Sequence, residues 1–235
     1  MKVRIKFAKY GSLRFIGHLD VMRFFQKANR RANIDVAYST GFSPHQIMSF
    51  AQPLGLGLES TGEYMDMEVN SLTSSREMKD ALNAQMVEGI EVLDVKLLPE
   101  NAGNAMASVA AAKYTIHFRK GMEPEFDYIS ALPDFYAQDE IIVTKKTKKS
   151  EATFDMKPSI YELYIGEDKE SIVMLVDSSS AGNIKPQLVL DAFYHMHGKT
   201  LDDYALLITR DETYTDIGSD TKRKLVPLAC IGEDF

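Results

Sequence analysis

Apolar and polar residues alternate over three stretches of the first hundred residues, 2–8, 63–70 and 91–98. A period of two is typical of a strand that buries one face. The first stretch has a basic residue at each of its polar positions, which predicts a basic outer face formed by Lys2, Arg4 and Lys6. A short further strand is expected over 46–51.

Two other stretches, 18–33 and 74–87, repeat their apolar residues every three or four positions, which predicts amphipathic helices. We expect Ser74 or Ser75 to cap the second helix. The first helix has an expected core stripe of Leu19, Met22, Phe25, Ala28 and Ala32. The resulting order of strand, helix, strand, strand, helix, strand predicts a ferredoxin-like antiparallel sheet with both helices on one face.

The second half approximately repeats this order of elements, without convincing sequence identity between the halves. Strands are expected over 113–119, 140–144, 161–165, 171–177 and 204–210, and helices over 124–132 and 185–196. We therefore expect the α+β class, with tandem ferredoxin-like (βαββαβ) domains and antiparallel sheets. The predicted boundaries are a basic N-terminal domain at 1–100, a linker at 101–112, a second domain at 113–210 and a C-terminal tail at 211–235.

The composition, with 45% apolar and 26% charged residues in a chain of 235, excludes collagen-like and disordered classes. The single cysteine, Cys230, excludes an internal disulfide and a Cys-rich zinc site or iron–sulfur cluster held by this chain alone. We therefore expect no metal site and no cofactor bound by this chain. No apolar run is long enough to span a membrane, and the charged first ten residues are unlike a signal peptide, so we expect a cytoplasmic protein.

Charge is distributed unevenly along the chain. The net charge is −7, yet residues 1–50 hold nine Lys and Arg against two acids, which leaves −14 for the remaining 185 residues. One interpretation is a surface that faces an anion on an otherwise acidic body. The other is that these basic side chains pair with acids that folding brings near.

The first predicted helix carries a row of basic residues, Arg23, Lys27, Arg30 and Arg31, on a face away from its core stripe. Eight aromatic residues lie in the same fifty positions, and Phe24 and Phe42 are the best candidates for exposure. Cations for phosphates and rings for stacking are typical of RNA-binding surfaces. The predicted nucleic-acid-binding residues are Arg14, Arg23, Lys27, Arg30, Arg31, Phe42 and His45. The basic run 145–149 is either a second cationic edge or a solvated guard of an edge strand.

No residue set matches an established catalytic signature, but His18, His45 and Tyr10 are candidate acid–base groups. With Arg23 or Lys27 as the cation, they would supply the groups that a metal-independent ribonuclease needs. We expect His45 to share a pocket with at least one of Tyr10, Arg14 and His18. The alternative is that His18 caps the helix and His45 hydrogen-bonds a loop carbonyl.

Several segments carry a family resemblance: Phe7-Ala8-Lys9-Tyr10-Gly11-Ser12-Leu13-Arg14-Phe15-Ile16-Gly17-His18-Leu19-Asp20, Arg30-Arg31-Ala32, Tyr38-Ser39-Thr40-Gly41-Phe42-Ser43-Pro44-His45, and Pro53-Leu54-Gly55 to Glu63-Tyr64. They resemble the radical-SAM-linked protein family, a bacterial domain of unknown function, with Gly17 in place of an expected serine and Gln46 in place of an expected proline. The resemblance implies a partner, because that family occurs fused to or encoded beside B12-binding radical S-adenosylmethionine (SAM) enzymes. This chain has no Cys-x-x-x-Cys-x-x-Cys, so radical chemistry would belong to a separate protein.

A looser similarity links the chain to the CRISPR repeat endoribonuclease family. It consists of the expected tandem domains and a Gly-Phe-x-Pro turn at 41–44, followed by a Ser-Phe-x-x-Pro-Leu run at 49–54. That resemblance implies RNA binding across a pair of domains. The glycine-rich C-terminal loop of that family is missing here, which argues against cleavage.

Three functional hypotheses follow. The first is a non-catalytic RNA-binding or substrate-presenting accessory protein that works with a separate radical SAM enzyme, in RNA modification. The second is a metal-independent endoribonuclease that uses His18 and His45. The third is a protein-interaction module whose basic face docks an acidic partner. Salt-dependent RNA binding separates the first two from the third, and cleavage without metal separates the second from the first.

Overall fold

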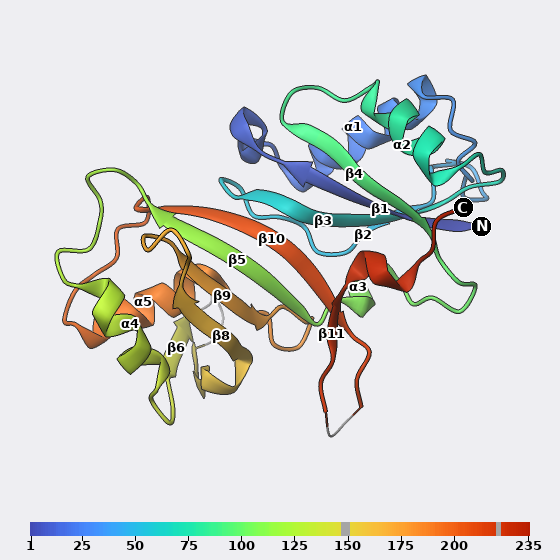
Figure 1. Ribbon diagram of the computed structural model, residues 1–235. Coiled ribbons are helices and arrows are strands. Elements are labelled where there is room, and N and C mark those ends of the chain that lie inside the picture. Colours follow the sequence, from blue (N-terminus) through green and yellow to red (C-terminus); the bar gives the residue numbers. More distant parts are fainter. Residues whose placement is uncertain (147–150, 220–221) are drawn as a thin grey trace. The chain divides into compact units, whose positions relative to one another are not determined.

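The computed structural model describes residues 1–146, 151–219 and 222–235, which form two compact units of mixed α and β structure (Figure 1). Unit 1 consists of Met1–Ala110 and Arg210–Phe235, and unit 2 consists of Ala111–Thr209. The sheets are largely antiparallel, as expected for the α+β class. No helix among the described residues is long and apolar enough to cross a membrane.

Unit 1 is a sheet with helices packed on it. Its elements are β1 (Lys2–Lys9), η1 (Gly11–Phe15), α1 (His18–Arg31), β2 (Met48–Phe50), β3 (Glu59–Glu68), α2 (Ser75–Asn83), β4 (Ile90–Leu97), α3 (Ala105–Ser108), β10 (Leu206–Asp216) from Arg210 onward, β11 (Leu225–Pro227) and η3 (Leu228–Ile231). Strand β1 pairs antiparallel with β4 on one side and with β3 on the other. Strands β2 and β10 both neighbour β3, and β11 pairs with β10.

Helix α2 is capped by Ser74, one of the two serines expected to cap it, and Glu77 completes a capping box. The Ser74 hydroxyl accepts a hydrogen bond from the Glu77 backbone N–H, and the Glu77 carboxylate accepts one from the Ser74 backbone N–H. These two bonds satisfy donors that a helix start otherwise leaves unpaired. Helices α1 and α2 contribute to the same hydrophobic cluster as β1, β3 and β4, so both pack on one face of the sheet.

The predicted core stripe of α1 is confirmed except at Leu19, since Met22 and Ala32 also pack, partly buried, against the core. Val21, Phe25 and Ala28 are buried, whereas Leu19 is 58% exposed. The Phe25 ring lies 4.9 Å from the Phe7 ring, which fixes the buried side of the helix. Asn29 is also fully buried, and its amide donates to the Gln46 side chain at 2.9 Å.

The predicted basic outer face of β1 is wrong at two of its three positions, because Arg4 and Lys6 are covered and paired. Arg4 is 1% exposed and forms a bidentate pair with Asp66 at 2.7 and 2.9 Å. Its third contact is the Leu228 carbonyl oxygen, at 3.1 Å. Lys6 donates to Glu212 at 2.6 Å. For these side chains, the alternative of pairing with nearby acids holds.

The observed units differ from the predicted domain boundaries. Residues 211–235, expected to form a tail, belong to unit 1. The Leu97 and Glu233 backbones bond to each other, and the Phe235 carbonyl accepts from the Ser75 N–H. The expected linker at 101–112 contains α3 and reaches into β5, and Ala110 donates to the Tyr214 carbonyl. Glu212 of the C-terminal segment pairs with Lys6 on β1, and Asp234 pairs with Lys96 on β4. No local pattern encodes these pairings.

Unit 2 has its own core. Its elements are β5 (Ala111–Phe118), α4 (Tyr128–Tyr136), β6 (Ile142–Lys146), β7 (Glu151–Asp155), η2 (Lys157–Ser159), β8 (Ile160–Ile165), β9 (Ile172–Asp177), α5 (Pro186–Met196) and the first residues of β10. The strand order is β10-β5-β9-β8, and β6 pairs with β7 as a separate hairpin. The β8–β9 hairpin confirms the one predicted around 166–168.

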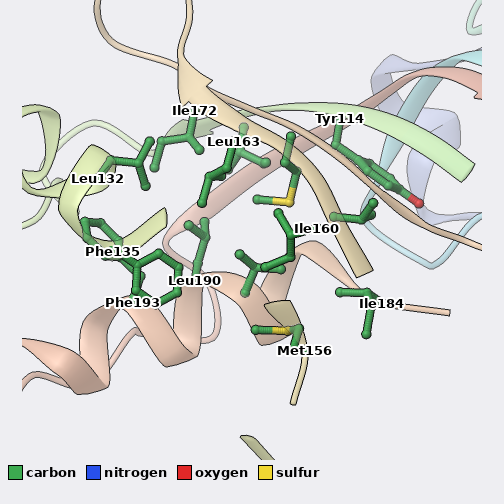
Figure 2. Close-up of a cluster of buried hydrophobic side chains, with 14 of the residues drawn as sticks. Tyr114, Leu132, Phe135, Met156, Ile160, Leu163, Ile172, Ile184, Leu190 and Phe193 are labelled. Carbon is green, nitrogen blue, oxygen red and sulfur yellow. The ribbon is translucent and has the colours of Figure 1, made fainter. Parts of the chain in front are cut away.

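Figure 2 shows side chains of α4 and α5, including Phe135 and Phe193, facing strand residues such as Leu163 and Ile172. The rings of Phe135 and Phe193 lie 5.2 Å apart. Residues 147–149 of the predicted basic run at 145–149 lie outside the described residues, and no side chain of that run is described.

Candidate nucleic-acid interface

The exposed face of α1 carries a row of cations. Arg23, Lys27 and Arg30 are all exposed. At about 100° per residue they lie on the side of the helix opposite Phe25 and Ala28. Their Cα atoms span about 10 Å along the axis, at about 1.5 Å per residue. The helix therefore presents three positive charges to solvent in one row.

The cations of this helix differ in how they are neutralised. Arg23 lies 3.5 Å from Asp20, and both side chains are about two-thirds exposed. Such a pair is weak in water. Arg31 donates to the side-chain and backbone oxygens of Gln85, both at 3.3 Å. Within the described part of the chain, no carboxylate pairs with Lys27 or Arg30, so these two are available to an anion.

A loop between α1 and β2 lies beside this row. Its base is Gln46, a buried residue whose amide donates to the Gln26 carbonyl at 3.0 Å and whose side-chain oxygen accepts from Asn29. Gln26 and Asn29 directly precede Lys27 and Arg30 in the helix. The loop therefore rises from the helical turn that carries the two available cations.

Phe42 stands on this loop and is fully exposed, as the sequence predicts, and Tyr38 is half exposed. The loop is closed by hydrogen bonds between its ends. The Ser39 N–H donates to the His45 carbonyl at 2.8 Å, and the His45 N–H donates to the Ser39 hydroxyl at 3.1 Å. Gly41, with φ at +112°, adopts a backbone conformation that side chains disfavour.

His45 has a local partner. Its Nδ1 lies 2.8 Å from the Ser39 hydroxyl oxygen, and the ring is exposed. The imidazole therefore braces the loop that presents Phe42. The same Nδ1 lies 3.5 Å from the Ser43 carbonyl oxygen, which agrees with the alternative that His45 hydrogen-bonds a loop carbonyl.

His18 lies elsewhere on the same helix. It is the first residue of α1, and its ring meets the Phe50 ring edge-on at 4.8 Å. It lines a cavity of about 20 Å³ with Lys9, Glu63 and neighbouring apolar residues, and His45 is not part of that lining. A cavity of this size holds about one water molecule.

The two candidate histidines are not brought together. The base of the loop that bears His45 bonds to Gln26, eight residues beyond His18. Eight residues correspond to about 12 Å along the helix axis. No contact in the described chain joins the two rings. The observed positions therefore give no support to the hypothesis that His18 and His45 act together as an acid–base pair.

Tyr10 and Arg14 flank the start of α1. Tyr10 is exposed, and its N–H donates to the Gly89 carbonyl. The Arg14 guanidinium contacts the Glu59 carboxylate at 3.1 Å and lies 4.9 Å from the Phe15 ring. An anion at Arg14 would have to compete with Glu59, so Arg14 is a weaker candidate than Lys27 or Arg30. Neither Tyr10 nor Arg14 lines the His18 cavity.

A buried charged cluster near His18 was missed by the sequence analysis. Lys9 is buried and donates to the Ile16 carbonyl at 3.2 Å, and Glu63 is buried beside Arg210 at 2.9 Å. Burial lowers the pKa of the Lys9 ammonium, and the Glu63 carboxylate partly offsets that effect. One signal was available, because Lys9 continues the odd-numbered series of inward residues that includes Phe7.

The described residues contain no candidate cluster for metal binding. In residues 1–146, 151–219 and 222–235, no group of three or more His, Cys, Asp and Glu side chains could hold an ion. The exposed Cys230 is the single cysteine of the chain.

A family model described as "Uncharacterized protein conserved in bacteria (DUF2344)" matches residues 2–186. The chain belongs to this family. Every residue of the α1 row and the 38–46 loop lies inside the DUF2344 match, whereas the C-terminal segment of unit 1 lies outside it. No curated protein matches the chain.

One solved structure, titled "Crystal Structure of a Cbf5-Nop10-Gar1 Complex", is similar with 12% sequence identity and a TM-score of 0.46. The similarity covers 90% of this chain and 48% of that chain, so this chain spans about half the length of that one.

Proposed function

We propose that this DUF2344 protein is a non-catalytic, cytoplasmic accessory that binds RNA through helix α1 and presents it to a separate radical SAM enzyme for modification. The observation that carries the proposal is the pair Lys27 and Arg30, exposed on one helix face with no carboxylate partner among the described residues. Phosphate contacts of this kind supply much of the affinity of a protein for nucleic acid.

RNA is favoured over an acidic protein by the aromatic residues beside the cations. Tyr38 and Phe42 are exposed on the loop whose base is bonded to α1. Rings next to cations suit a ligand that has both bases and phosphates. An acidic protein surface could pair with the cations, but its carboxylates would not contact the Phe42 ring.

We further propose that each unit is a ferredoxin-like domain. In unit 1 the strand order β4-β1-β3-β2, with α1 and α2 in one core cluster, supports this assignment. In unit 2 the order β10-β5-β9-β8, with α4 and α5 in one cluster, supports it in the same way. Among the described elements, β6 and β7 of unit 2 and α3 and β11 of unit 1 have no counterpart in that pattern.

The proposed partner rests on the resemblance of residues 3–70 to the radical-SAM-linked family. With one cysteine, this chain cannot supply the three thiolates of such an enzyme's cluster, so the radical step is assigned to the partner. No cofactor is assigned to this chain. The endoribonuclease hypothesis is not favoured by any contact, because His18 and His45 have separate surroundings.

The test is a charge reversal on the α1 row. Lys27→Glu with Arg30→Glu should weaken binding of an unstructured oligoribonucleotide, and the log–log salt slope should fall by about 0.7 for each phosphate that the protein no longer neutralises. The matched control, Arg76→Glu with Lys120→Glu, makes the same change in net charge at two other exposed positions. Fluorescence anisotropy over a range of salt concentrations measures both quantities. If the two double variants bind equally, the α1 row is not the RNA surface and docking of an acidic partner becomes the better hypothesis.

A further inference from the structure

Phe42 is a large apolar side chain held in water by an ordered loop. The hydrogen bonds between Ser39 and His45 close the loop below it, and Gly41 forms the turn next to it. Covering an exposed phenylalanine side chain is favourable, because it removes apolar surface from water. A loop braced in this way keeps the ring from folding back to recover that free energy, so the ring is presented to an external partner.

The position of the loop indicates what that partner is. Gln46 ties the loop to the carbonyl of Gln26 and to the side chain of Asn29, the neighbours of Lys27 and Arg30. An extended ligand that covers Phe42 and continues past the base of the loop along α1 would meet these two cations. It must offer a flat apolar face and negative charge within a short reach, which is the chemistry of a nucleotide.

We propose that Phe42 stacks on an unpaired base of single-stranded RNA whose neighbouring phosphates contact Lys27 and Arg30. This rests on the proposed function and adds the class of substrate. In an RNA duplex the bases are already stacked on each other, and the major groove is too deep and narrow for a side chain to read. A ring on a loop can reach a base only where the strand is unpaired, so the surface selects single strands.

The chain contains no tryptophan, so Phe42→Trp introduces a single fluorophore at the proposed contact. We would titrate this variant with an oligouridylate of about twelve nucleotides, a length within the usual range of single-strand sites. The same strand annealed to oligoadenylate is the duplex comparison. Tyr204→Trp, at a 77% exposed position in unit 2, is the matched control.

The single strand should quench the Phe42→Trp fluorescence in a saturable manner, and the duplex and the Tyr204→Trp control should give no such response. Phe42→Ala should bind the single strand at least about fivefold more weakly than the parent protein, as expected for the loss of one stacked base. Because Phe42 is fully exposed, this change leaves the fold intact, which circular dichroism verifies.

Two results would overturn the stacking proposal. If RNA binds and the α1 charge reversal weakens it, but Phe42→Ala binds normally and Phe42→Trp stays unquenched, stacking is wrong and the proposed function stands. If no RNA binds the parent protein, both proposals fail. In that case, a blue shift of Phe42→Trp with vesicles of anionic phospholipid would assign the ring to a membrane surface instead.

Discussion

The sheet of unit 1 buries five charged side chains, Arg4, Lys9, Glu63, Asp66 and Arg210. In unit 2 the buried polar residues of the described chain are two serines, Ser171 and Ser178, and the remaining buried side chains are apolar. The two units share an order of helices and strands but bury different chemistry.

The difference follows from how each unit is assembled. Unit 2 is one continuous segment, and unit 1 joins two segments that lie about a hundred residues apart in the sequence. Two of the joining contacts are ion pairs: Lys6 bonds to Glu212, and Glu63 bonds to Arg210. Buried ion pairs add little net stability, but an arrangement that leaves one buried charge without a partner lowers the free energy of unfolding strongly. Our hypothesis is that the charges set the register of the C-terminal segment on the sheet.

The largest effect is expected from removing one partner of the buried Arg4–Asp66 ion pair in unit 1. Arg4→Met leaves the Asp66 carboxylate buried without a cation and should lower the free energy of unfolding by about 3–5 kcal/mol. The double variant Arg4→Met with Asp66→Leu replaces both charges and should recover most of the loss. Urea unfolding measures both variants. A double variant as unstable as the single one would mean that the pair does not act as a charge pair.

A substitution that creates a cavity in the apolar core of unit 2 tests the second half of the comparison. Leu190 is fully buried in α5, and Leu190→Ala should cost about 2–4 kcal/mol through weaker packing and the space left behind. Leu188→Ala, at a partly buried position of the same helix, is the control and should cost less. Hydrogen exchange should show reduced protection within residues 111–209. Equal losses of stability for the two variants would contradict a tightly packed core at Leu190.

The smallest expected effect on stability is a pH dependence that comes from Asp168, in the turn between β8 and β9 of unit 2. Hydrogen bonds from the backbone N–H groups of Ser171 and Glu170 and from the Ser171 hydroxyl hold the pKa of the Asp168 carboxyl well below 3.8. The folded state therefore prefers the ionised carboxyl. Its contribution to stability is fully present above about pH 3.8 and is lost as the pH falls toward the lowered value.

Asp168→Asn should accordingly lower stability at neutral pH and remove part of the loss that the parent protein shows below pH 4. Asp134→Asn, at an exposed carboxyl of α4, is the control. Acid unfolding followed by circular dichroism compares the three proteins. An identical acid profile for Asp168→Asn and the parent would show that the turn does not couple to folding.

Local patterns predicted the elements whose residues are recognised by their neighbours in the chain. The alternation in 2–8 corresponds to β1, and the serine before 75–83 caps α2 through Glu77. Of the two aromatic residues expected to be exposed, Phe42 is exposed, whereas Phe24 is partly buried against the core of unit 1. These features depend on hydrogen bonds and periodicities that span a few residues.

What the tertiary structure decided is the environment of each charge. The sequence marks Arg4 and Lys27 equally as basic residues on polar faces, yet Arg4 is buried against Asp66, 62 residues away, and Lys27 is left in solvent. Separating His18 from His45 likewise required the contact between Gln46 and Gln26. Periodicity reports which side of a strand or helix a residue occupies. The partner of a charged side chain, and the strength of its interaction with that partner, depend on burial and on distant segments. Both are defined only once the chain has folded.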